Sequence, residues 1–151
     1  MHISAKVDYA VRALVVLAAS DGKPLAGSAI AEAGGLPPKF LDGILAELRR
    51  SGLVHSQRGF EGGYRLARPA KTIALADVFR AIDGPLAEVR GERPETTSYV
   101  GVAESLQGVW IAVRASLRNV LEQTSIADVA SNHLPRHVQR FVDDPDAWLA
   151  R

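Results

Sequence analysis

The sequence predicts a mainly α-helical (α+β) fold, in which a small helical domain carries one β-hairpin and is followed by a single long helix. Three observations predict it. Apolar residues recur at helical spacing in three segments before residue 52, two short β-type runs then flank a glycine-rich loop, and an apolar seam follows residue 100. We expect a first domain over residues 1–85, a connecting loop over residues 86–99, and a helical part over residues 100–151.

The composition limits the classes of protein to which the chain can belong. The chain has 151 residues, 47% of them hydrophobic, with a net charge of +1 and no cysteine. This length gives one domain, or one domain with an appendage, and the ordinary apolar fraction excludes a disordered chain. The lack of cysteine excludes disulfides, thiolate zinc sites, Cys-ligated iron–sulfur clusters and Cys nucleophiles.

Two helices are predicted before residue 36. An apolar stripe at spacings of three and four predicts the first over residues 3–19, and the Gly22 and Pro24 pair ends it. Ser28 is a suitable N-cap for a short second helix, which the glycine pair at residues 34–35 closes.

A third helix is predicted to begin after Pro37 and Pro38 and to run to about Ser51. Its apolar stripe comprises Phe40, Leu41, Ile44, Leu45 and Leu48. Two short helices joined by a glycine-containing turn, the second of them amphipathic, describe a helix-turn-helix.

The next segment predicts a β-hairpin. Residues 52–56 and 64–67 are strand-like, and the loop between them contains three glycines, which suit tight or positive-φ backbone. The arms and tip carry four basic residues against one acid, Glu61; the basic residues are Arg58, Arg65, Arg68 and Lys71. A helix-turn-helix followed by a basic hairpin, or wing, is the winged-helix pattern.

The charge is divided unevenly between the two halves of the chain. Residues 1–72 hold ten Lys and Arg against six Asp and Glu, a balance of +4, and residues 73–151 hold eight against eleven, a balance of −3. A basic half is typical of a protein that binds nucleic acid.

The second half predicts a helix over residues 75–82, a loop over residues 86–98, and one long helix over residues 100–122. The apolar seam of the long helix comprises Val102, Leu106, Val109, Trp110, Val113, Leu117, Val120 and Leu121. A seam of this length on a helix outside a closed domain needs a partner, and a second copy of the chain gives a two-fold dimer. A last short helix is predicted over residues 125–130, with Thr124 or Ser125 as its cap.

These segments resemble the Rrf2 family of bacterial winged-helix regulators, of which the IscR and NsrR types are members. The resemblance covers residues 1 to about 130, and its most specific part is a wing that reads RGxxGGYxLA. The matching segments are residues 3–4, 8–14, 30–32, 40–41, 48–54, 56–59, 62–67 and 82–86.

The resemblance implies a homodimeric DNA-binding transcription regulator, usually a repressor, that recognises a pseudo-palindromic operator. It places the third helix in the major groove, the wing in the minor groove, and the dimer interface on the long helix. Cluster-binding relatives use three cysteines in the loop before that helix, residues 88–104 here, and this chain has none. Some of them add a carboxylate at the position of Asp8, which cannot hold such a cluster without thiolates.

The candidate DNA-binding residues are Lys39, Asp42, Arg49, Arg50, Arg58, Gly59 and Arg65. On the family pattern, Lys39 and Asp42 lie nearest the base edges, where Lys can reach guanine or a phosphate and Asp can accept from cytosine. The alternative is that both are solvated polar residues on a helix, or that they form an ion pair with each other. Arg58 suits a narrow minor groove.

The remaining candidates have simpler roles. Arg49, Arg50, Arg65 and Arg68 can neutralise phosphates, although about half of such surface arginines should be inert. Gly59 lies beside Arg58, and we expect the wing glycines to serve backbone geometry more than to contact DNA themselves.

Two alternatives to a DNA-binding regulator were weighed. An enzyme is disfavoured, since no phosphate-binding loop, nucleophile elbow or convergent His and acid pair is present. A winged-helix protein-interaction module that has lost sequence-specific DNA binding is the stronger alternative. His133 and His137 could form a metal pair only on a regular helix, which Pro135 interrupts.

We therefore expect no cofactor and no metal, with double-stranded DNA and a second copy of the chain as partners. Whether a small molecule or a protein acts as an effector stays an open question. The start of the chain lacks a signal-peptide pattern, and the apolar run over residues 13–19 is only seven residues long, far short of the roughly 20 that span a bilayer. A cytoplasmic protein without a membrane partner is the expectation.

Overall fold

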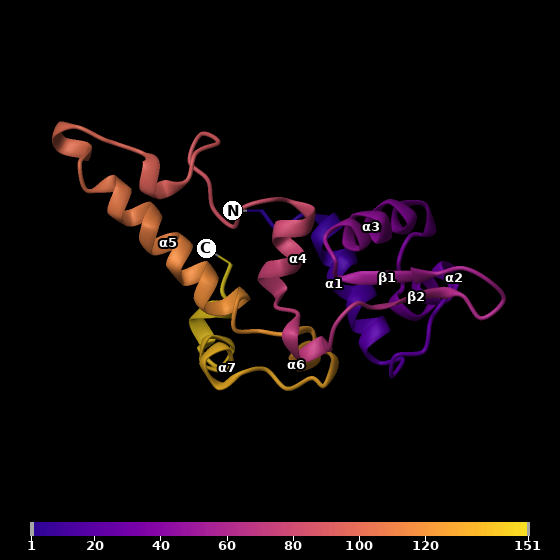
Figure 1. Ribbon diagram of the computed structural model, residues 1–151. Coiled ribbons are helices and arrows are strands. Elements are labelled where there is room, and N and C mark those ends of the chain that lie inside the picture. The colour runs from indigo at the N-terminus through magenta and orange to yellow at the C-terminus, as the bar shows by residue number, and fades with distance from the viewer. Residues whose placement is uncertain (1, 151) are drawn as a thin grey trace.

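The computed structural model describes residues 2–150, and these form a helical body from which a β-hairpin and one long helix project (Figure 1). The elements of the body and the hairpin are, in chain order, α1 (Ala5–Ala18), α2 (Gly27–Gly34), α3 (Pro38–Arg50), β1 (Val54–Gln57), β2 (Gly63–Leu66), a 3-10 turn (Ala70–Thr72) and α4 (Leu75–Ile82). The predicted order of helices and strands in this half is confirmed.

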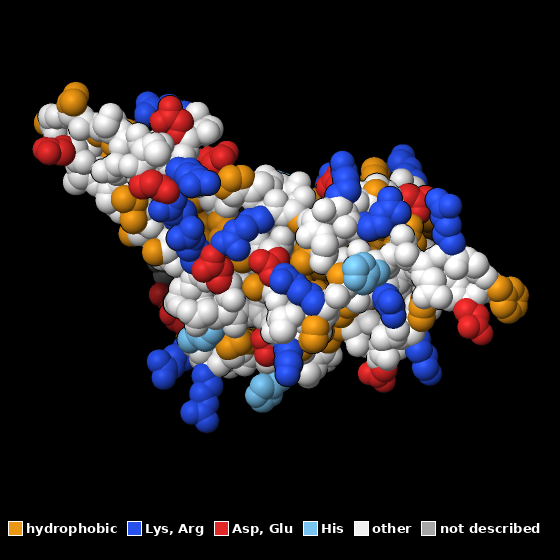
Figure 2. All heavy atoms as spheres, viewed as in Figure 1, with side chains coloured by type: hydrophobic (Ala, Val, Ile, Leu, Met, Phe, Trp, Pro, Cys, Tyr) orange, Lys and Arg blue, Asp and Glu red, His pale blue; other side chains and the backbone are white. Residues whose placement is uncertain are grey.

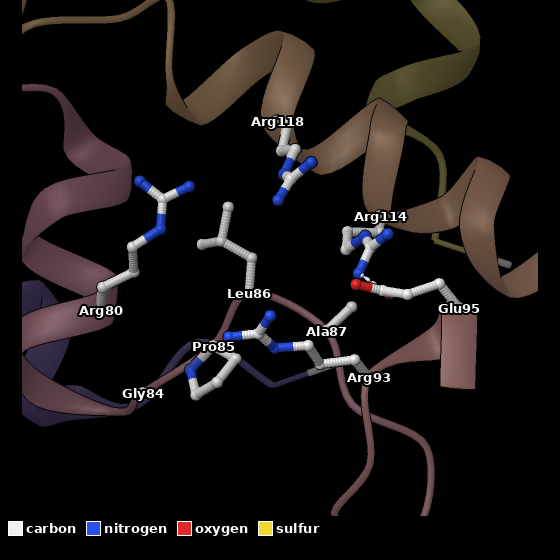
Figure 3. A pocket seen from close by; sticks show the side chains of 9 residues that line it. All are labelled: Arg80, Gly84, Pro85, Leu86, Ala87, Arg93, Glu95, Arg114 and Arg118. Atoms are coloured by element: carbon white, nitrogen blue, oxygen red, sulfur yellow. Dashed lines mark hydrogen bonds and ion pairs between the residues drawn. The ribbon is translucent and has the colours of Figure 1, made fainter. Parts of the chain in front are cut away.

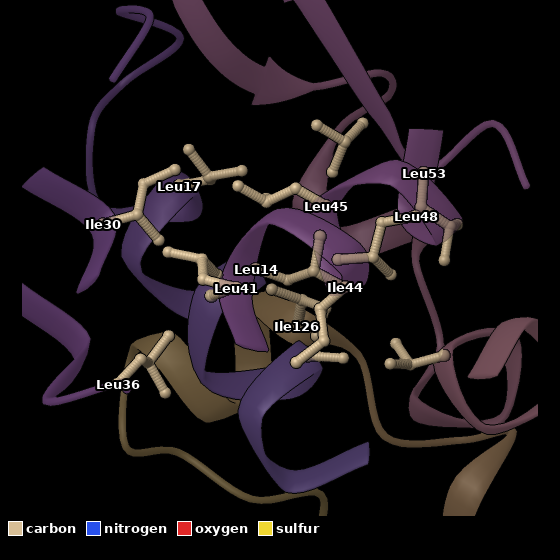
Figure 4. Packing of buried hydrophobic residues seen from close by; sticks show 14 of the residues in the cluster. Leu14, Leu17, Ile30, Leu36, Leu41, Ile44, Leu45, Leu48, Leu53 and Ile126 are labelled. Atoms are coloured by element: carbon tan, nitrogen blue, oxygen red, sulfur yellow. The ribbon is translucent and has the colours of Figure 1, made fainter. Parts of the chain in front are cut away.

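The hydrophobic core lies between α1, α2, α3 and α4 (Figure 4). Leu14 of α1 and Leu45 of α3 are both fully buried at its centre, with Ile30 of α2 beside them. The apolar stripes that predicted the helices therefore meet one another, and α3 keeps its polar face toward solvent.

The second helix begins two residues earlier than predicted. Ala26 is its N-cap, with no side-chain cap, and Ser28 lies exposed in the first turn, so the prediction that Ser28 caps the helix is wrong. The cause is Leu25, whose backbone pairs with Tyr64 of β2 and holds the chain extended up to the first helical residue. Gly35 ends α2 in the left-handed conformation at φ +58, as the glycine pair predicts.

The wing is a two-stranded antiparallel hairpin in which Val54 pairs with Leu66 and Gln57 pairs with Gly63. Leu25 adds two further hydrogen bonds, because its N–H donates to Tyr64 O at 2.9 Å and the Tyr64 N–H donates to Leu25 O at 2.7 Å. The hairpin is thus attached to the segment that leads into α2, which fixes its position beside the helix-turn-helix.

The C-terminal part contains a 3-10 turn (Pro94–Thr96), a second (Gly101–Ala103), α5 (Leu106–Leu121), α6 (Ile126–Ala130), α7 (Arg136–Val142) and a final 3-10 turn (Pro145–Trp148). The predicted helix over residues 100–122 starts too early. Val102 lies in the 3-10 turn, which begins at Gly101 with φ +63, and α5 has 16 residues. At 1.5 Å per residue α5 is about 24 Å long.

The chain returns from α5 to the first domain. The Ile126 N–H donates to Ile73 O at 2.9 Å and the Leu75 N–H donates to Thr124 O at 2.8 Å, and Ile126 is fully buried in the main core. Ser125 caps α6, and its hydroxyl and N–H donate to the Asp128 carboxylate, which lowers the pKa of Asp128. The helix α6 lies in the predicted C-terminal part, residues 100–151, but it packs into the core of the N-terminal domain.

None of the helices within residues 2–150 combines the length and the hydropathy that crossing a membrane requires.

Candidate nucleic-acid interface

Three elements meet around a shallow hollow of about 410 Å³ on the surface of the first domain. Its lining comes from the start of α2, the start of α3 and the strand β2, and comprises Gly27, Ser28, Pro38, Leu41, Asp42 and Tyr64. The Leu25–Tyr64 pairing causes this arrangement, because it holds the base of the wing against the helix-turn-helix. The structure therefore brings the predicted recognition helix and the wing to one surface.

Lys39 and Asp42 lie exposed in the first turns of α3. The Lys39 ammonium lies 5.2 Å from the centre of the Phe40 ring, a cation–π contact at the surface. No ion pair joins Lys39 to Asp42, nor does either form a pair with another residue between 2 and 150. The ion-pair alternative for these two residues is absent, and both polar groups stay available to a ligand.

The two arginines at the C-terminal end of α3 each contact another side chain of the protein. Arg49 donates from Nη1 to Ser56 Oγ at 3.2 Å, which ties the end of α3 to β1. Arg50 lies 3.9 Å from Glu47, a loose pair on an exposed side chain. Neither contact is strong enough to prevent these arginines from turning toward a phosphate.

The wing carries two cations that the fold itself does not use. Arg58 and Arg65 are exposed, and within residues 2–150 neither side chain forms a hydrogen bond or an ion pair. Arg68 differs, because its Nη2 donates to Asp77 Oδ2 at 2.6 Å and joins the base of the wing to α4. Figure 2 shows Lys and Arg side chains over the half of the molecule that contains α3 and the wing.

Sequence reasoning missed two residues on this surface. Ser28 lines the hollow from the first turn of α2, a helix that has no side-chain cap at its start. Phe60 is completely exposed at the wing tip, next to the basic Arg58. The signal for Phe60 was present in the sequence, since it is an aromatic residue in a loop of glycines and charges, where no core can form.

Two glycines of the wing are required by close backbone contacts. A Cβ atom on Gly63, whose φ is +147, would lie 2.5 Å from Leu25 O, and a Cβ atom on Gly62 would lie 2.4 Å from Gln57 O. Gly59 has φ +110 and an open environment, so only its backbone conformation favours glycine. The expectation that these glycines serve wing geometry therefore has a structural basis at Gly62 and Gly63.

Replacing Gly63 by alanine is expected to lower the free energy of unfolding by about 1–3 kcal/mol, because the new methyl group meets the Leu25 carbonyl at a φ that other residues rarely adopt. Gly43→Ala is the matched control. Gly43 lies within α3 with nothing near its Cβ position, so alanine there should stabilise the protein by about 0.5–1 kcal/mol. Urea unfolding measures both; equal effects of the two substitutions would contradict the contact.

The predicted dimer seam is distributed over two faces of α5. Val109 and Val113 are half-exposed on one face, and no residue of α5 is buried. The Trp110 N–H donates to Tyr99 Oη at 3.1 Å, so Trp110 faces the preceding loop. Leu106, Leu117, Val120 and Leu121 are partly buried, and Val102 is fully exposed outside α5.

The donor groups of the described residues do not fit iron or an iron–sulfur cluster. The chain has no cysteine, and residues 2–150 contain no group of three His, Asp or Glu side chains that could hold a metal ion. In the loop of residues 88–104, Glu95 is already paired with Arg114. A hydrogen bond from its own backbone N–H, and then the hydrogen bond from Arg114, lower the pKa of Glu95. His137 instead bonds the Asn119 carbonyl at 2.9 Å, and His133 lies outside α7.

Comparison with known proteins identifies the relatives of the chain. The model of the Rrf2 family, described as an iron-dependent transcriptional regulator, matches residues 3–132. Rv1287 of Mycobacterium tuberculosis, named as an HTH-type transcriptional regulator, is 52% identical over 145 residues, which cover 95% of this chain and 90% of that protein. CymR of Bacillus subtilis, also named as an HTH-type transcriptional regulator, is 31% identical over 87% of this chain and 91% of its own length.

Solved structures agree with this relationship. The structure of B. subtilis CymR, described as the global cysteine regulator of that organism, superposes with a TM-score of 0.73 at 30% identity and covers 87% of this chain and 98% of that one. The structure of IscR from T. potens gives a TM-score of 0.65 at 29% identity and covers 100% of this chain and 93% of that one. The chain belongs to the Rrf2 family of winged helix-turn-helix transcriptional regulators.

Proposed function

We propose that the protein is a homodimeric repressor that binds a pseudo-palindromic operator in double-stranded DNA without an iron–sulfur cluster. The observation that carries the proposal is the pair of exposed, unengaged arginines on the wing, Arg58 and Arg65, beside the hollow where α2, α3 and β2 meet. The fold gains nothing from these two charges, whereas a phosphate backbone or a minor groove would bind them.

Each part of this surface has a role in the proposal. The start of α3 enters the major groove, where Lys39 and Asp42 face base edges and Arg49 and Arg50 contact phosphates. Arg58 enters the minor groove from the wing tip with Gly59 as its flexible neighbour, and Arg65 contacts a phosphate. Exposed Phe60 lies where an apolar side chain can pack against the sugars of the same groove.

The dimer is proposed to form through α5. This helix projects from the body at the opposite end to the wing in Figure 1, so pairing through α5 leaves both wings free. Its half-exposed Val109 and Val113 lie four residues apart, on one helical face. Two DNA-binding domains related by a two-fold axis match the symmetry of a pseudo-palindromic operator. The proposal involves no catalytic step and places the protein in the cytoplasm.

A protein-interaction module that has lost DNA binding is the competing function. The observation that argues against it is again electrostatic, because a docking surface for a protein does not require arginines without side-chain partners at the tip and on the strand β2 of a wing. The two functions predict different salt dependences, which the next experiment measures.

Operator affinity is expected to fall steeply with salt, and Arg58→Ala is expected to weaken it by about 1–3 kcal/mol while lowering the salt slope by about one. Duplex fragments selected from genomic DNA by the protein serve as the operator, and fluorescence anisotropy at several salt concentrations gives both quantities. Arg140→Ala on α7, an exposed arginine far from the wing, is the control and should leave both unchanged. A flat salt dependence would favour the docking module, and an unchanged affinity for Arg58→Ala would reject its role in the groove.

A further inference from the structure

A second group of cations lies far from the wing, where α4, the segment after it and α5 enclose a pocket of about 390 Å³ (Figure 3). Its lining comprises Arg80, Gly84, Pro85, Leu86, Ala87, Arg93, Glu95, Arg114 and Arg118. The four arginines come from three separate elements, and Figure 3 shows their side chains gathered around Leu86. Figure 2 shows Lys and Arg side chains at the same junction of α4 and α5.

The carboxylates around this pocket do not balance its arginines. Arg114 pairs with Glu95, whereas Arg80 and Arg118 share the single carboxylate of Glu122. The Arg93 guanidinium forms no hydrogen bond or ion pair within residues 2–150 and acts on Glu95 only through space. Two positive charges are thus left in excess.

A further carboxylate nearby does not remove this excess. Asp77 Oδ1 lies 3.8 Å from Arg80, but Asp77 Oδ2 accepts a hydrogen bond from Arg68 at 2.6 Å, so Asp77 is already engaged with another cation. The Arg114 side chain is only 16% exposed, which removes much of the water that would otherwise solvate its charge. Arginines converge in this way where a planar or tetrahedral anion accepts paired hydrogen bonds.

The size and the wall of the pocket limit the anion. A volume of this order lies at the lower end of the range for small-molecule sites. Pro85, Leu86 and Ala87 supply an apolar wall between the guanidinium groups, which suits a short carbon chain between two negative charges, or a phosphate on a small organic group. A simple monoanion would satisfy only half of the excess charge.

We propose that this pocket binds a small organic dianion, a dicarboxylate or a phosphate monoester, and that the bound dianion is the effector of the regulator. The pocket joins α4, which packs on the DNA-binding domain, to α5, which we assign to the dimer. A ligand bound between α4 and α5 would set the angle between the DNA-binding domain and the dimer helix of the same chain. That angle determines the spacing of the two wings in the dimer. The effector role rests on the proposed function, whereas the binding of the anion does not.

The first experiment measures anion binding in the absence of DNA. Isothermal titration calorimetry of the full chain with succinate, with inorganic phosphate and with acetate identifies the anion class. We expect succinate or phosphate to bind with a millimolar or lower dissociation constant and acetate at least about tenfold more weakly, as expected for the loss of one charge-assisted hydrogen-bonded group. Succinate alone would identify a carboxylate site, and phosphate alone a phosphoryl site.

The matched variants are Arg93→Gln in the pocket and Arg136→Gln on α7. Neither arginine side chain forms a hydrogen bond or an ion pair within residues 2–150, so neither substitution removes a side-chain contact of the fold, and both change the net charge equally. Arg93→Gln should weaken anion binding by about tenfold or more, and Arg136→Gln should leave it unchanged. No binding of either dianion, or equal binding by the two variants, would overturn the site.

The second experiment adds the best-binding anion to the operator titration. A change in operator affinity that Arg93→Gln abolishes supports the effector role. Anion binding with an unchanged operator affinity overturns that role and leaves the site, whereas anion binding by a protein with no affinity for DNA shows that the proposed function has failed and the effector role with it.

Discussion

Replacing Val109 and Val113 together by glutamate is expected to convert the proposed dimer to a monomer and to weaken the proposed operator binding by about 100- to 10,000-fold, the gain that joining two binding units typically provides. The two side chains share one face of α5, where they are 50% and 42% exposed in the single chain. In a symmetric helix pair each glutamate would meet its own copies or other apolar groups without water. Neither residue takes part in the core, so the fold itself should survive.

Light scattering and operator anisotropy on the same preparation test this expectation, and far-ultraviolet circular dichroism confirms that the variant is folded. Phe141→Glu/Leu149→Glu is the matched control, because it also replaces two exposed apolar side chains, 57% and 60% exposed, by glutamate. A Val109→Glu/Val113→Glu protein that still scatters as a dimer would refute the α5 interface. A monomer with full operator affinity would refute the expectation that operator binding requires two DNA-binding domains.

Most of the winged helix could be predicted because its elements carry local signals. Leu14 and Leu45 belong to stripes at helical spacing, and these stripes are buried as their periodicity indicates, except at Phe40, which is 52% exposed. The wing was predictable from its glycines, and the contact of Gly63 with Leu25 O explains why a glycine is needed there.

The features that sequence reasoning missed depend on contacts between distant segments. Ser28 is the best N-cap residue near the start of α2, yet the pairing of Leu25 with Tyr64 sets where the helix begins. Val102 continues the apolar spacing of α5, but Gly101 adopts a positive φ and the segment forms a separate 3-10 turn. At both positions the tertiary structure, and not the local helix propensity, decides where the helix begins.

The arginine pocket could not be predicted from the sequence, because it also depends on contacts between distant segments. Arg80 and Arg118 are separated by 38 positions in the sequence, and their convergence on Glu122 depends on how the chain turns back between α4 and α5. No periodicity in the sequence records such a contact. The candidate DNA-binding residues, in contrast, lie within the helix-turn-helix and its wing, so the sequence pattern of that one unit is enough to propose them.

Replacing Leu45 by alanine is expected to lower the free energy of unfolding by about 2–5 kcal/mol, the range measured for large-to-small changes in packed cores. Leu45 is fully buried in the inner face of α3, among side chains of the main cluster that include Leu14 and Leu48. The deleted methyl groups leave a cavity that the rigid neighbours fill only in part. Since the same residue holds the recognition helix on the body, the helix loses its support and the whole domain loses stability together.

Urea unfolding followed by circular dichroism measures this loss, with Leu149→Ala as the control. Leu149 is 60% exposed, so the same deletion of atoms there should change the stability by less than about 0.5 kcal/mol. A small effect for Leu45→Ala would mean that α3 is not held by this core. If α3 is held as described, the folded fraction of Leu45→Ala should still bind the operator, because Leu45 lies on the face of α3 opposite to its exposed polar residues.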